Sequence, residues 1–386
     1  MAMMISLLLL PLVAQAQAQL PLKLDEPWSV KYGAQNDLGF SGILSYAHLP
    51  YYKCLEDASH SFDIAILGMP FDTTTSYRPG ARFGPYAIRS GSRRQSLGPY
   101  SWDLSWETNP GRLGSEIIDC GDVPVTPMDN AKAIDQMEVA YTTLINRPAV
   151  GATRTSALAK DGVEHPRVIT LGGDHTIVLP ILRALHKVYG PVSVIHFDSH
   201  MDTGAVEGRT DQERITHGSY FTVAHEEHLM TNTSIHGGIR SKMSRQKGPT
   251  QVNHDEAVGF QVISAEDIDD YGIKKVIKAI RERVGDSPVY LSLDIDVIDP
   301  GLAPATGTPE ADGWTTREMK RIIRGLAGLN FVGADIVEVA PAYDHGDITG
   351  IAAADLVHDF LVAMQIDEPP KAGHKGSPWA AEDLLP

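Results

Sequence analysis

The sequence lacks three features that would each define a class of protein: many cysteines, an excess of basic residues, and a long apolar run. Cys54 and Cys120 are its only cysteines. They are too few for a disulfide framework and wrongly spaced for a structural zinc site, and the sequence does not decide whether they pair. Lysine and arginine number 33 against 49 aspartates and glutamates. Such a surface repels phosphate backbones, which excludes general nucleic-acid binding and leaves cations, metals and basic small molecules as the natural partners.

The N-terminus is predicted to be a secretory signal. Ile5–Val13 is an apolar run of nine residues, followed by small residues that alternate with glutamine up to Ala18. The run is too short to cross a bilayer, and the small residues are typical of a cleavage site. We expect residues 1–18 to be removed after Ala16 or Ala18, and the mature protein to be secreted or to enter the secretory pathway or vacuole. Without cleavage, we expect a cytoplasmic protein. No later run is long enough to span a membrane.

Between residues 61 and 366, short apolar runs alternate with longer helical stretches. This alternation is typical of an α/β fold with a parallel sheet covered on both faces. No linker divides the stretch, so we predict one catalytic domain over 61–366, an N-terminal extension over 19–60 and a loose tail over 367–386. The predicted strands are Phe62–Gly68, Ser115–Cys120, Arg167–Gly172, Val192–Asp198, Ser234–Ile239, Phe260–Ile263, Val289–Asp296 and Phe331–Val339. The predicted helices are Pro85–Ser92, Ala131–Ile145, Thr176–Val188, Gly218–Glu227, Ile273–Val284, Thr316–Leu326 and Ile348–Gln365.

Ionisable residues gather at the ends of three predicted strands. In an open parallel sheet, chemistry collects beyond the carboxyl ends of the strands. Residues two apart on an extended chain also point to the same side, so such side chains can converge just past a strand. The strand predicted over 192–198 leads to Asp198, His200 and Asp202, and the strand over 289–296 ends in Asp294 and Asp296, so both have ionisable residues at every second position. The strand over 167–172 is followed by a glycine turn that carries His175.

These residues predict a site for two metal ions. Four carboxylates buried together repel one another unless cations compensate their charge. Oxygen ligands with imidazole and no thiolate favour manganese, while zinc, cobalt and nickel stay open. Two histidines and four aspartates exceed the needs of one ion, and shared carboxylates suit a pair about 3.5–4 Å apart. His196 is out of phase with the neighbouring ligands, and we interpret it as a structural histidine.

The segments around these residues resemble the signatures of the ureohydrolase family, which contains arginase, agmatinase, guanidinobutyrase and formimidoylglutamase. The matching runs are Gly172-Gly173-Asp174-His175, His196-Phe197-Asp198-Ser199-His200-Met201-Asp202, Ser292–Pro300, Pro304–Glu310 and Asp335–Asp344. The resemblance implies a three-layer α-β-α sandwich on a mostly parallel sheet of about eight strands. It also implies two manganese ions bridged by Asp198 and Asp294, and a homo-oligomer, either a trimer or a hexamer.

The same resemblance assigns two catalytic residues outside the metal cluster. Glu338 matches the glutamate that binds the guanidinium group, and His217 matches the histidine credited with proton transfer. The unperturbed pKa of histidine suits that task. The implied reaction is hydrolysis of a guanidine to urea and an amine, for which metals lower the pKa of the attacking water.

Residues 203–216 are expected to form the rim that selects the substrate. The rim lacks the serine-rich, asparagine-containing loop of arginases, and the surrounding pattern resembles agmatinases. We therefore predict hydrolysis of agmatine to putrescine and urea, with carboxylates such as Glu207 favouring its ammonium. Arg209 and Arg214 leave a guanidino acid as the alternative, with 4-guanidinobutanoate giving 4-aminobutanoate and urea. A non-catalytic secreted binding protein of the same fold is the alternative from another class, disfavoured because all six ligand positions are filled.

Overall fold

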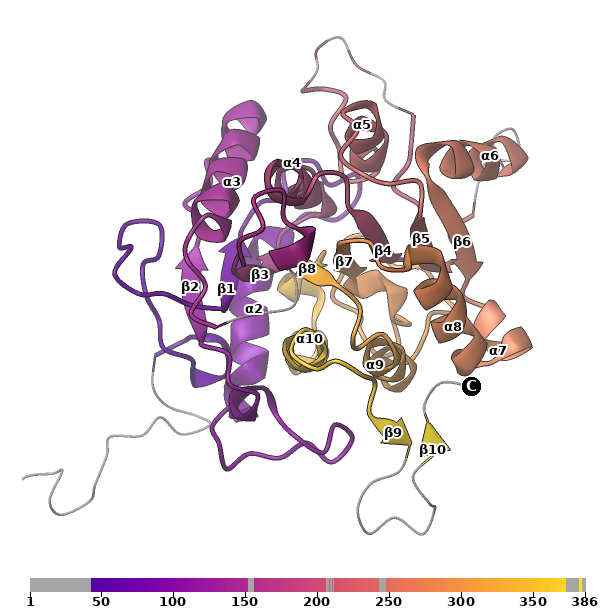
Figure 1. The fold of residues 1–386 in the computed structure, drawn as a ribbon. Helices are drawn as coiled ribbons and strands as arrows, with labels where there is room; N and C mark the ends of the chain where they lie inside the picture. The colour runs from indigo at the N-terminus through magenta and orange to yellow at the C-terminus, as the bar shows by residue number, and fades with distance from the viewer. Residues whose placement is uncertain are drawn as a thin grey trace, which may run out of the picture. The chain divides into compact units, whose positions relative to one another are not determined.

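A computed structural model describes residues 43–151, 156–205, 208, 210, 212–242, 248–372 and 382–383. Its central strands are β1 (Ile64–Met69), β2 (Ile117–Asp122), β3 (Arg167–Gly172), β4 (Ser193–Phe197), β5 (Ser234–Ile239), β6 (Phe260–Ser264), β7 (Val289–Asp294) and β8 (Phe331–Val337). They form one parallel sheet in the order β2-β1-β3-β8-β7-β4-β5-β6 (Figure 1). Each apolar run predicted to be a strand forms one of these eight, so the predicted parallel sheet is confirmed.

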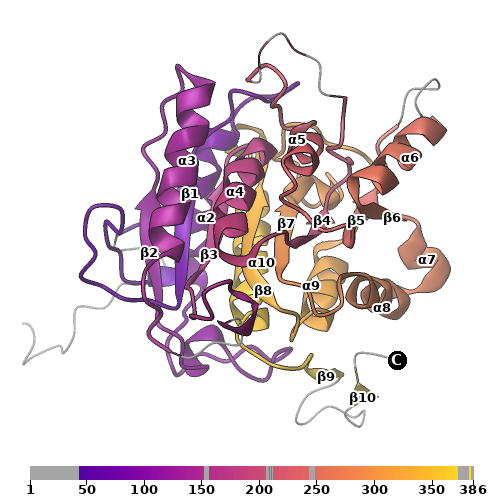
Figure 2. The same ribbon diagram turned by 45° about the horizontal axis from the view of Figure 1, so that its top comes forward.

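Helices cover both faces of this sheet (Figures 1 and 2). One layer contains α3 (Asn130–Ile145), α4 (Val178–Tyr189), α5 (Tyr220–Glu226) and α6 (Gly248–Val258). The other contains α2 (Gly84–Gly91), α8 (Ile273–Val284), α9 (Thr316–Gly325) and α10 (Ile348–Ala363), with the short α7 (Asp267–Tyr271) beside α8. The three-layer α-β-α sandwich implied by the resemblance is confirmed.

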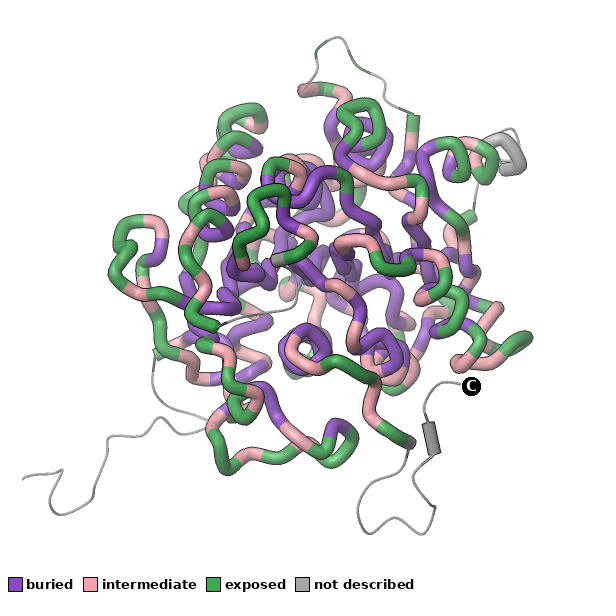
Figure 3. The backbone as a smooth tube through the Cα atoms, in the orientation of Figure 1, coloured by how far each residue is buried: buried purple, intermediate pink, exposed green. Residues whose placement is uncertain are grey.

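The alternation of side chains along each strand builds two cores. Ile64 and Ile66 of β1 pack into the core on the α2 and α10 side, while Ala65 and Leu67 pack into the core on the α3 and α4 side. The strands are therefore buried on both faces, as the tube in Figure 3 shows along the sheet. This double burial explains why the strands read as continuous apolar runs rather than alternating ones.

Two helices, α6 and α7, are absent from the sequence prediction. The α6 segment, Gly248-Pro249-Thr250-Gln251-Val252-Asn253-His254-Asp255-Glu256-Ala257-Val258, is mostly polar and shows no apolar stripe at helical spacing. Helical periodicity is the signal on which such a prediction rests. Its polar side chains instead contact the loop after β4, as described below.

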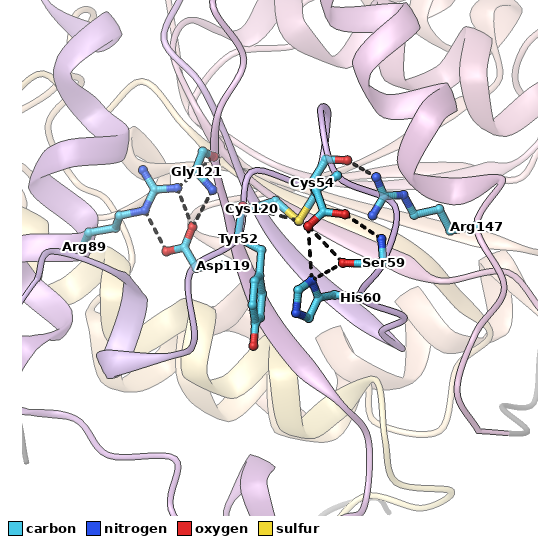
Figure 4. The surroundings of a disulfide bond; sticks show 10 residues. Tyr52, Cys54, Ser59, His60, Arg89, Asp119, Cys120, Gly121 and Arg147 are labelled. Atoms are coloured by element: carbon cyan, nitrogen blue, oxygen red, sulfur yellow. Dashed lines mark hydrogen bonds and ion pairs between the residues drawn. A yellow bond between two sulfur atoms is a disulfide. The ribbon is translucent and has the colours of Figure 1, made fainter.

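The described part of the predicted N-terminal extension lies along β2, the edge strand of the sheet. Tyr51 forms a parallel bridge with Asp119, and Cys54 forms a disulfide bond with Cys120, 66 residues away (Figure 4). Both sulfur-bearing residues are buried. Arg89 holds the two carboxylate oxygens of Asp119 from α2, at 2.8 and 2.9 Å. Covering the edge strand in this way removes a template for pairing with another chain.

Some predicted segments fall outside the described residues. These are the predicted signal over 1–18, the extension up to residue 42, and most of the predicted tail beyond residue 372. Within that tail, β9 (Lys371–Ala372) and β10 (Glu382–Asp383) pair as a short antiparallel ladder. Across the residues that the structure describes, no helix combines the length and apolar character needed to cross a bilayer.

Candidate metal centre and active site

The residues predicted to bind metal come together at the carboxyl end of the sheet. β3, β8, β7 and β4 are neighbours at its centre, and the segments at their ends carry the six predicted ligands and Glu338. A tight turn follows β3, where a Cβ on Gly173 would lie 2.0 Å from the carbonyl oxygen of Phe71. Only glycine lets the chain pass there, and this turn places His175 over the strand ends.

The first group of ligands surrounds His175. Its Nδ1 atom faces three carboxylate oxygens, at 3.1 Å from Asp198, 3.1 Å from Asp202 and 3.4 Å from Asp294. The second group surrounds His200, whose Nδ1 lies 3.2 Å from Oδ1 of Asp198 and 3.1 Å from Oδ2 of Asp296. Asp198 presents one oxygen to each group, which is the arrangement that a residue shared between two ions requires.

Backbone hydrogen bonds orient the carboxylates. Oδ1 of Asp294 accepts from the N–H of Asp296 at 2.8 Å, and Oδ1 of Asp296 accepts from the N–H of Ser199 at 3.0 Å. Each of these carboxylates keeps its other oxygen directed at a histidine. Asp202 has a φ of 54°, in the left-handed region that few residues other than glycine adopt. Such strained conformations cluster at functional sites.

The hydrogen bonds of His175 test whether a cation fits. Its Nε2 lies 2.8 Å from Oγ of Ser292, and the Ser292 hydroxyl donates to Asp335 at 3.0 Å. Oγ therefore accepts from Nε2–H, so Nδ1 of the neutral ring carries no proton. Neither this Nδ1 nor Oδ2 of Asp198 has a hydrogen-bond partner. Buried acceptors that face one another without a donor fit a bound cation.

The cluster holds more negative charge than its histidines balance. Burial, followed by the charges of Asp296 and Asp198, raises the pKa of Asp294 well above its usual value. Burial lowers the pKa of His175 and of His200, but the facing carboxylates outweigh burial and raise both. Protons or cations must therefore hold the cluster together, and the donor set of carboxylate oxygen and imidazole nitrogen fits two divalent cations.

Glu338 follows β8 beside the first group. It adopts a φ of 62° and is 1% exposed. Oε1 accepts from the backbone N–H of His175 at 2.9 Å, whereas the buried Oε2 has no hydrogen-bond partner. A Cβ on Gly307 would lie 3.3 Å from this Oε2 and 3.0 Å from the carbonyl oxygen of Arg78. The glycine in the Pro304–Glu310 loop thus leaves the free carboxylate oxygen open.

His217 contacts Glu338 directly. Its Nδ1 lies 3.1 Å from Oε1 of Glu338, and its Nε2 accepts from the backbone N–H of Ser76 at 3.0 Å. Burial lowers the pKa of His217, but the hydrogen bond and charge of Glu338 outweigh burial and raise the pKa to about 9. The proton on Nδ1 therefore faces the carboxylate.

A cavity of about 280 Å³ adjoins these residues. Its lining combines members of the metal cluster with His217 and with polar residues outside the cluster: His200, Asp202, Asp294, Ser76, Thr203, Ser241, Gln251 and Thr308. A small cavity with few apolar residues suits a small polar ligand. None of the described residues that line it is a lysine or arginine.

Gln251 reaches this cavity from α6. Its Nε2 donates to the carbonyl oxygen and to Oγ1 of Thr203, at 3.2 and 3.0 Å. Because a carbonyl oxygen only accepts, the amide nitrogen is fixed at Thr203 and Oε1 is left for another donor. The Thr203 hydroxyl donates to Asp255, a fully buried carboxylate on the same helix, and burial raises the pKa of Asp255 to about 6. α6 therefore holds the residue that follows Asp202.

The charged rim residues are only partly within the described chain. Arg214 forms an ion pair with Glu226 of α5 at 2.6 Å and does not line the cavity. Glu207, Arg209 and Asp211 lie outside the described residues.

The sequence did not predict the roles of Ser292, Ser76 and Gln251 in the site. Ser292 lies two positions before Asp294 on β7, so strand alternation was a signal that could have found it. Ser76 and Gln251 approach from a loop and from the unpredicted helix, and only the tertiary structure brings them to the site.

Comparisons with known proteins agree with this geometry. The sequence profile described as "Arginase family" matches residues 62–363. The chain is 54% identical over 336 residues to "Putative agmatinase 1" of Schizosaccharomyces pombe, covering 86% of this chain and 84% of that protein. It is 33% identical over 340 residues to an agmatinase of Chromobacterium violaceum, covering 86% and 92%. Proclavaminate amidinohydrolase from Streptomyces clavuligerus has a similar structure, with a TM-score of 0.72 and 32% identity over 85% of this chain and 98% of that one.

Proposed function

The chain belongs to the arginase family and is an agmatinase-like ureohydrolase, and we propose that it hydrolyses agmatine to putrescine and urea with two manganese ions. The sequence similarity to proteins named agmatinase supports this substrate. The residues that line the cavity favour agmatine over a guanidino acid.

The two ions are assigned to the two groups of ligands. His175, Asp202, Asp198 and Asp294 would hold one ion, and His200, Asp296, Asp198 and Asp294 the other, with the last two aspartates shared. Oxygen and imidazole donors without thiolate favour manganese over soft metals. When bound, a metal pair of this kind lowers the pKa of water and stabilises negative charge as it develops on the reacting group.

Glu338 is assigned to the guanidinium group. Its free Oε2 is buried and can accept a hydrogen bond from a guanidinium N–H, a charge-assisted contact. The strained backbone and the hydrogen bond from the His175 N–H fix this oxygen beside the metal ligands. The substrate carbon is thereby held next to the site at which water attacks, which reduces the entropic cost of the reaction.

His217 is assigned to proton transfer. Hydrolysis breaks the bond between the guanidinium carbon and the alkyl-bearing nitrogen, so that nitrogen must gain a proton to leave as an amine. With a pKa of about 9, His217 is protonated at neutral pH and can supply it. In the protonated ring Nε2 no longer accepts from the Ser76 N–H, whereas Oγ of Ser76, 2.8 Å from Nε2, can either donate or accept and so can contact the ring in both protonation states.

The far end of the substrate distinguishes agmatine from a guanidino acid. Agmatine ends in an ammonium, which needs acceptors, whereas 4-guanidinobutanoate ends in a carboxylate, which needs a cation or donors. Among the described residues, the lining offers Oε1 of Gln251 as an acceptor and no lysine or arginine. Arg214 is already paired with Glu226. This absence of a cationic partner among the described lining residues is the observation that favours agmatine.

Urea release from a panel of guanidines tests the proposal. Purified protein supplied with Mn²⁺ should have a kcat/KM for agmatine at least tenfold above that for 4-guanidinobutanoate or arginine. Arg214→Ala should leave agmatine turnover unchanged, because an exposed ion pair of this kind is worth only about 0–1 kcal/mol. A preference for 4-guanidinobutanoate, lost in Arg214→Ala, would establish the guanidino-acid alternative. No urea from any guanidine would favour the non-catalytic binding protein.

We also propose that the protein is secreted or enters the secretory pathway or vacuole. The disulfide between Cys54 and Cys120 supports an oxidising compartment, since such bonds are rare in the cytosol. N-terminal sequencing of the native protein should find a chain that begins after Ala16 or Ala18. Recovery of Met1 would contradict the proposal.

A further inference from the structure

Among the described contacts, both ring nitrogens of His217 are already engaged. Its Nδ1 lies 3.1 Å from Oε1 of Glu338, and its Nε2 lies 3.0 Å from the backbone nitrogen and 2.8 Å from Oγ of Ser76. Oε1 of Glu338 also accepts from the backbone N–H of His175. A proton on His217 can therefore reach a substrate only through one of these partners, or after one of the contacts breaks.

Ser76 is the partner that can pass a proton on. A hydroxyl accepts one hydrogen bond while it donates another, whereas a carboxylate only accepts. Ser76 is exposed, and it lines the same cavity as His217. Its Oγ can therefore contact Nε2 of His217 on one side and a molecule bound in the cavity on the other.

The loop that carries Ser76 is anchored on both sides of this residue. Before it, the backbone N–H and the hydroxyl of Thr74 donate to Oδ2 of the fully buried Asp174, at 3.1 and 2.6 Å. After it, the backbone N–H of Gly80 donates to Oδ2 of the buried Asp72 at 2.8 Å. The Ser76 hydroxyl is thus positioned before a substrate binds, which lowers the entropic cost of using it in a reaction.

We propose that the Ser76 hydroxyl is a catalytic proton relay between His217 and the leaving nitrogen of the substrate. This inference rests on the proposed function, in which His217 is the proton donor. The C–N bond breaks, and its electron pair moves to the alkyl-bearing nitrogen, which takes the proton of the Ser76 hydroxyl. Oγ takes the proton from Nε2 of His217 in its place. The neutral His217 then regains a proton from solvent water.

The backbone of Ser76 favours this direction of transfer. Its N–H can donate to Nε2 of His217 only when that nitrogen carries no proton. The contact therefore stabilises the neutral ring that remains after the proton has moved to the substrate. In the protonated ring, Nε2–H donates to Oγ of Ser76 instead, which is the contact from which the transfer starts.

Two substitutions separate the hydroxyl from the rest of Ser76. Ser76→Ala removes Oγ but keeps the backbone N–H that contacts Nε2 of His217. Ser76→Thr keeps a hydroxyl at the same position. Thr73→Ala is the matched control, because it removes a hydroxyl from the same loop, one that donates to Asn130 rather than to His217.

The experiment measures urea release by protein supplied with Mn²⁺ from two substrates that differ in their leaving nitrogen. One is the guanidine that the wild type hydrolyses fastest. The other is its guanidinooxy counterpart, in which oxygen replaces the methylene next to the guanidine group. An alkoxyamine is a much weaker base than an alkylamine, so its departure depends less on a proton donor.

The relay predicts a loss that depends on the leaving nitrogen. In Ser76→Ala, we expect kcat for the guanidine to fall roughly 10–100-fold while KM stays within about twofold. For the guanidinooxy substrate, the fall in kcat should be less than about threefold. Ser76→Thr and Thr73→Ala should stay within about threefold of wild type on both substrates.

Two results would overturn the relay while leaving the proposed function in place. One is a wild-type kcat in Ser76→Ala. The other is an equal loss on both substrates, which would indicate a structural role of the serine or a role in binding. A wild-type protein that releases urea from no guanidine would overturn the proposed function and the relay together.

Discussion

Replacing Glu338 by glutamine removes one charge from the active site while preserving its shape. The backbone N–H of His175 needs an acceptor, so the amide oxygen of the glutamine should take the place of Oε1. The amide NH2 group then occupies the place of Oε2, where it presents a donor to a guanidinium group that only donates. The variant therefore loses a charge-assisted hydrogen bond and gains an unfavourable contact in a buried position.

The expected loss follows from these two effects. A hydrogen bond to a charged group contributes about 1.5–3 kcal/mol, and the mismatched donor adds to this loss. We expect kcat/KM for agmatine to fall about 100-fold or more in Glu338→Gln, which corresponds to about 3 kcal/mol of transition-state stabilisation. Urea release at a series of agmatine concentrations measures it. Glu226→Gln is the control, because Glu226 pairs with Arg214 outside the cavity.

The same variant should change the pH profile. In the wild type, Glu338 raises the pKa of His217 to about 9, so the proton donor is present below pH 9 and is lost as the pH rises through that value. Without Glu338, His217 loses the hydrogen bond and the charge that do most to raise its pKa, so the pKa should fall and the alkaline limb of kcat/KM should move to lower pH. A loss of less than about fivefold with an unchanged alkaline limb would refute the roles of both residues.

Asp255→Asn should raise the melting temperature at pH 8 and raise it less at pH 5. Burial raises the pKa of Asp255 in the folded protein to about 6 from 3.8. The fold is therefore most stable below pH 3.8, where this group is protonated in both states, and it loses stability as the pH rises through 6. Removing the buried charge should recover about 1–3 kcal/mol of the free energy of unfolding at pH 8. Equal shifts at both pH values would contradict this. Cys54→Ser with Cys120→Ser should lower the free energy of unfolding by about 2–4 kcal/mol in a denaturant titration, and a stability insensitive to both substitution and reduction would argue against the disulfide. Gln251→Leu should raise KM for agmatine about tenfold, because one hydrogen bond to its ammonium is lost. KM for butylguanidine, which lacks the ammonium, should not change. An equal change for both substrates would show that Gln251 does not recognise the ammonium end of agmatine.

The sheet and the convergence of the metal ligands were predictable because both depend on local sequence. Strands buried on both faces appear as apolar runs, and their carboxyl ends meet at one edge of a parallel sheet. Asp198, His200 and Asp202 needed only this rule and the alternation of an extended chain. The strand order then places β3, β8, β7 and β4 side by side, which brings His175 and Asp294 to the same place.

The features that the sequence did not predict depend on contacts between distant segments. His236 of β5 lies with its Nδ1 2.8 Å from Nδ1 of His196 because β4 and β5 are aligned in one register. A sequence does not specify the register between two buried strands by pattern alone. Helix α6 has no apolar stripe because its polar side chains are used at Thr203, and Gln251 was missed with it. Pairing of Cys54 with Cys120 likewise required knowing that residues 50–54 lie along β2.

The central claim is that six residues at three strand ends bind two divalent cations, with Asp198 and Asp294 shared between them. Metal content per chain, measured by elemental analysis of gel-filtered wild-type protein and of Asp198→Ala and Asp294→Ala, tests it most directly. Two manganese ions per wild-type chain are expected, and each variant should hold less than one tightly bound ion and release no urea from agmatine. Two tightly bound ions in both variants would contradict the claim.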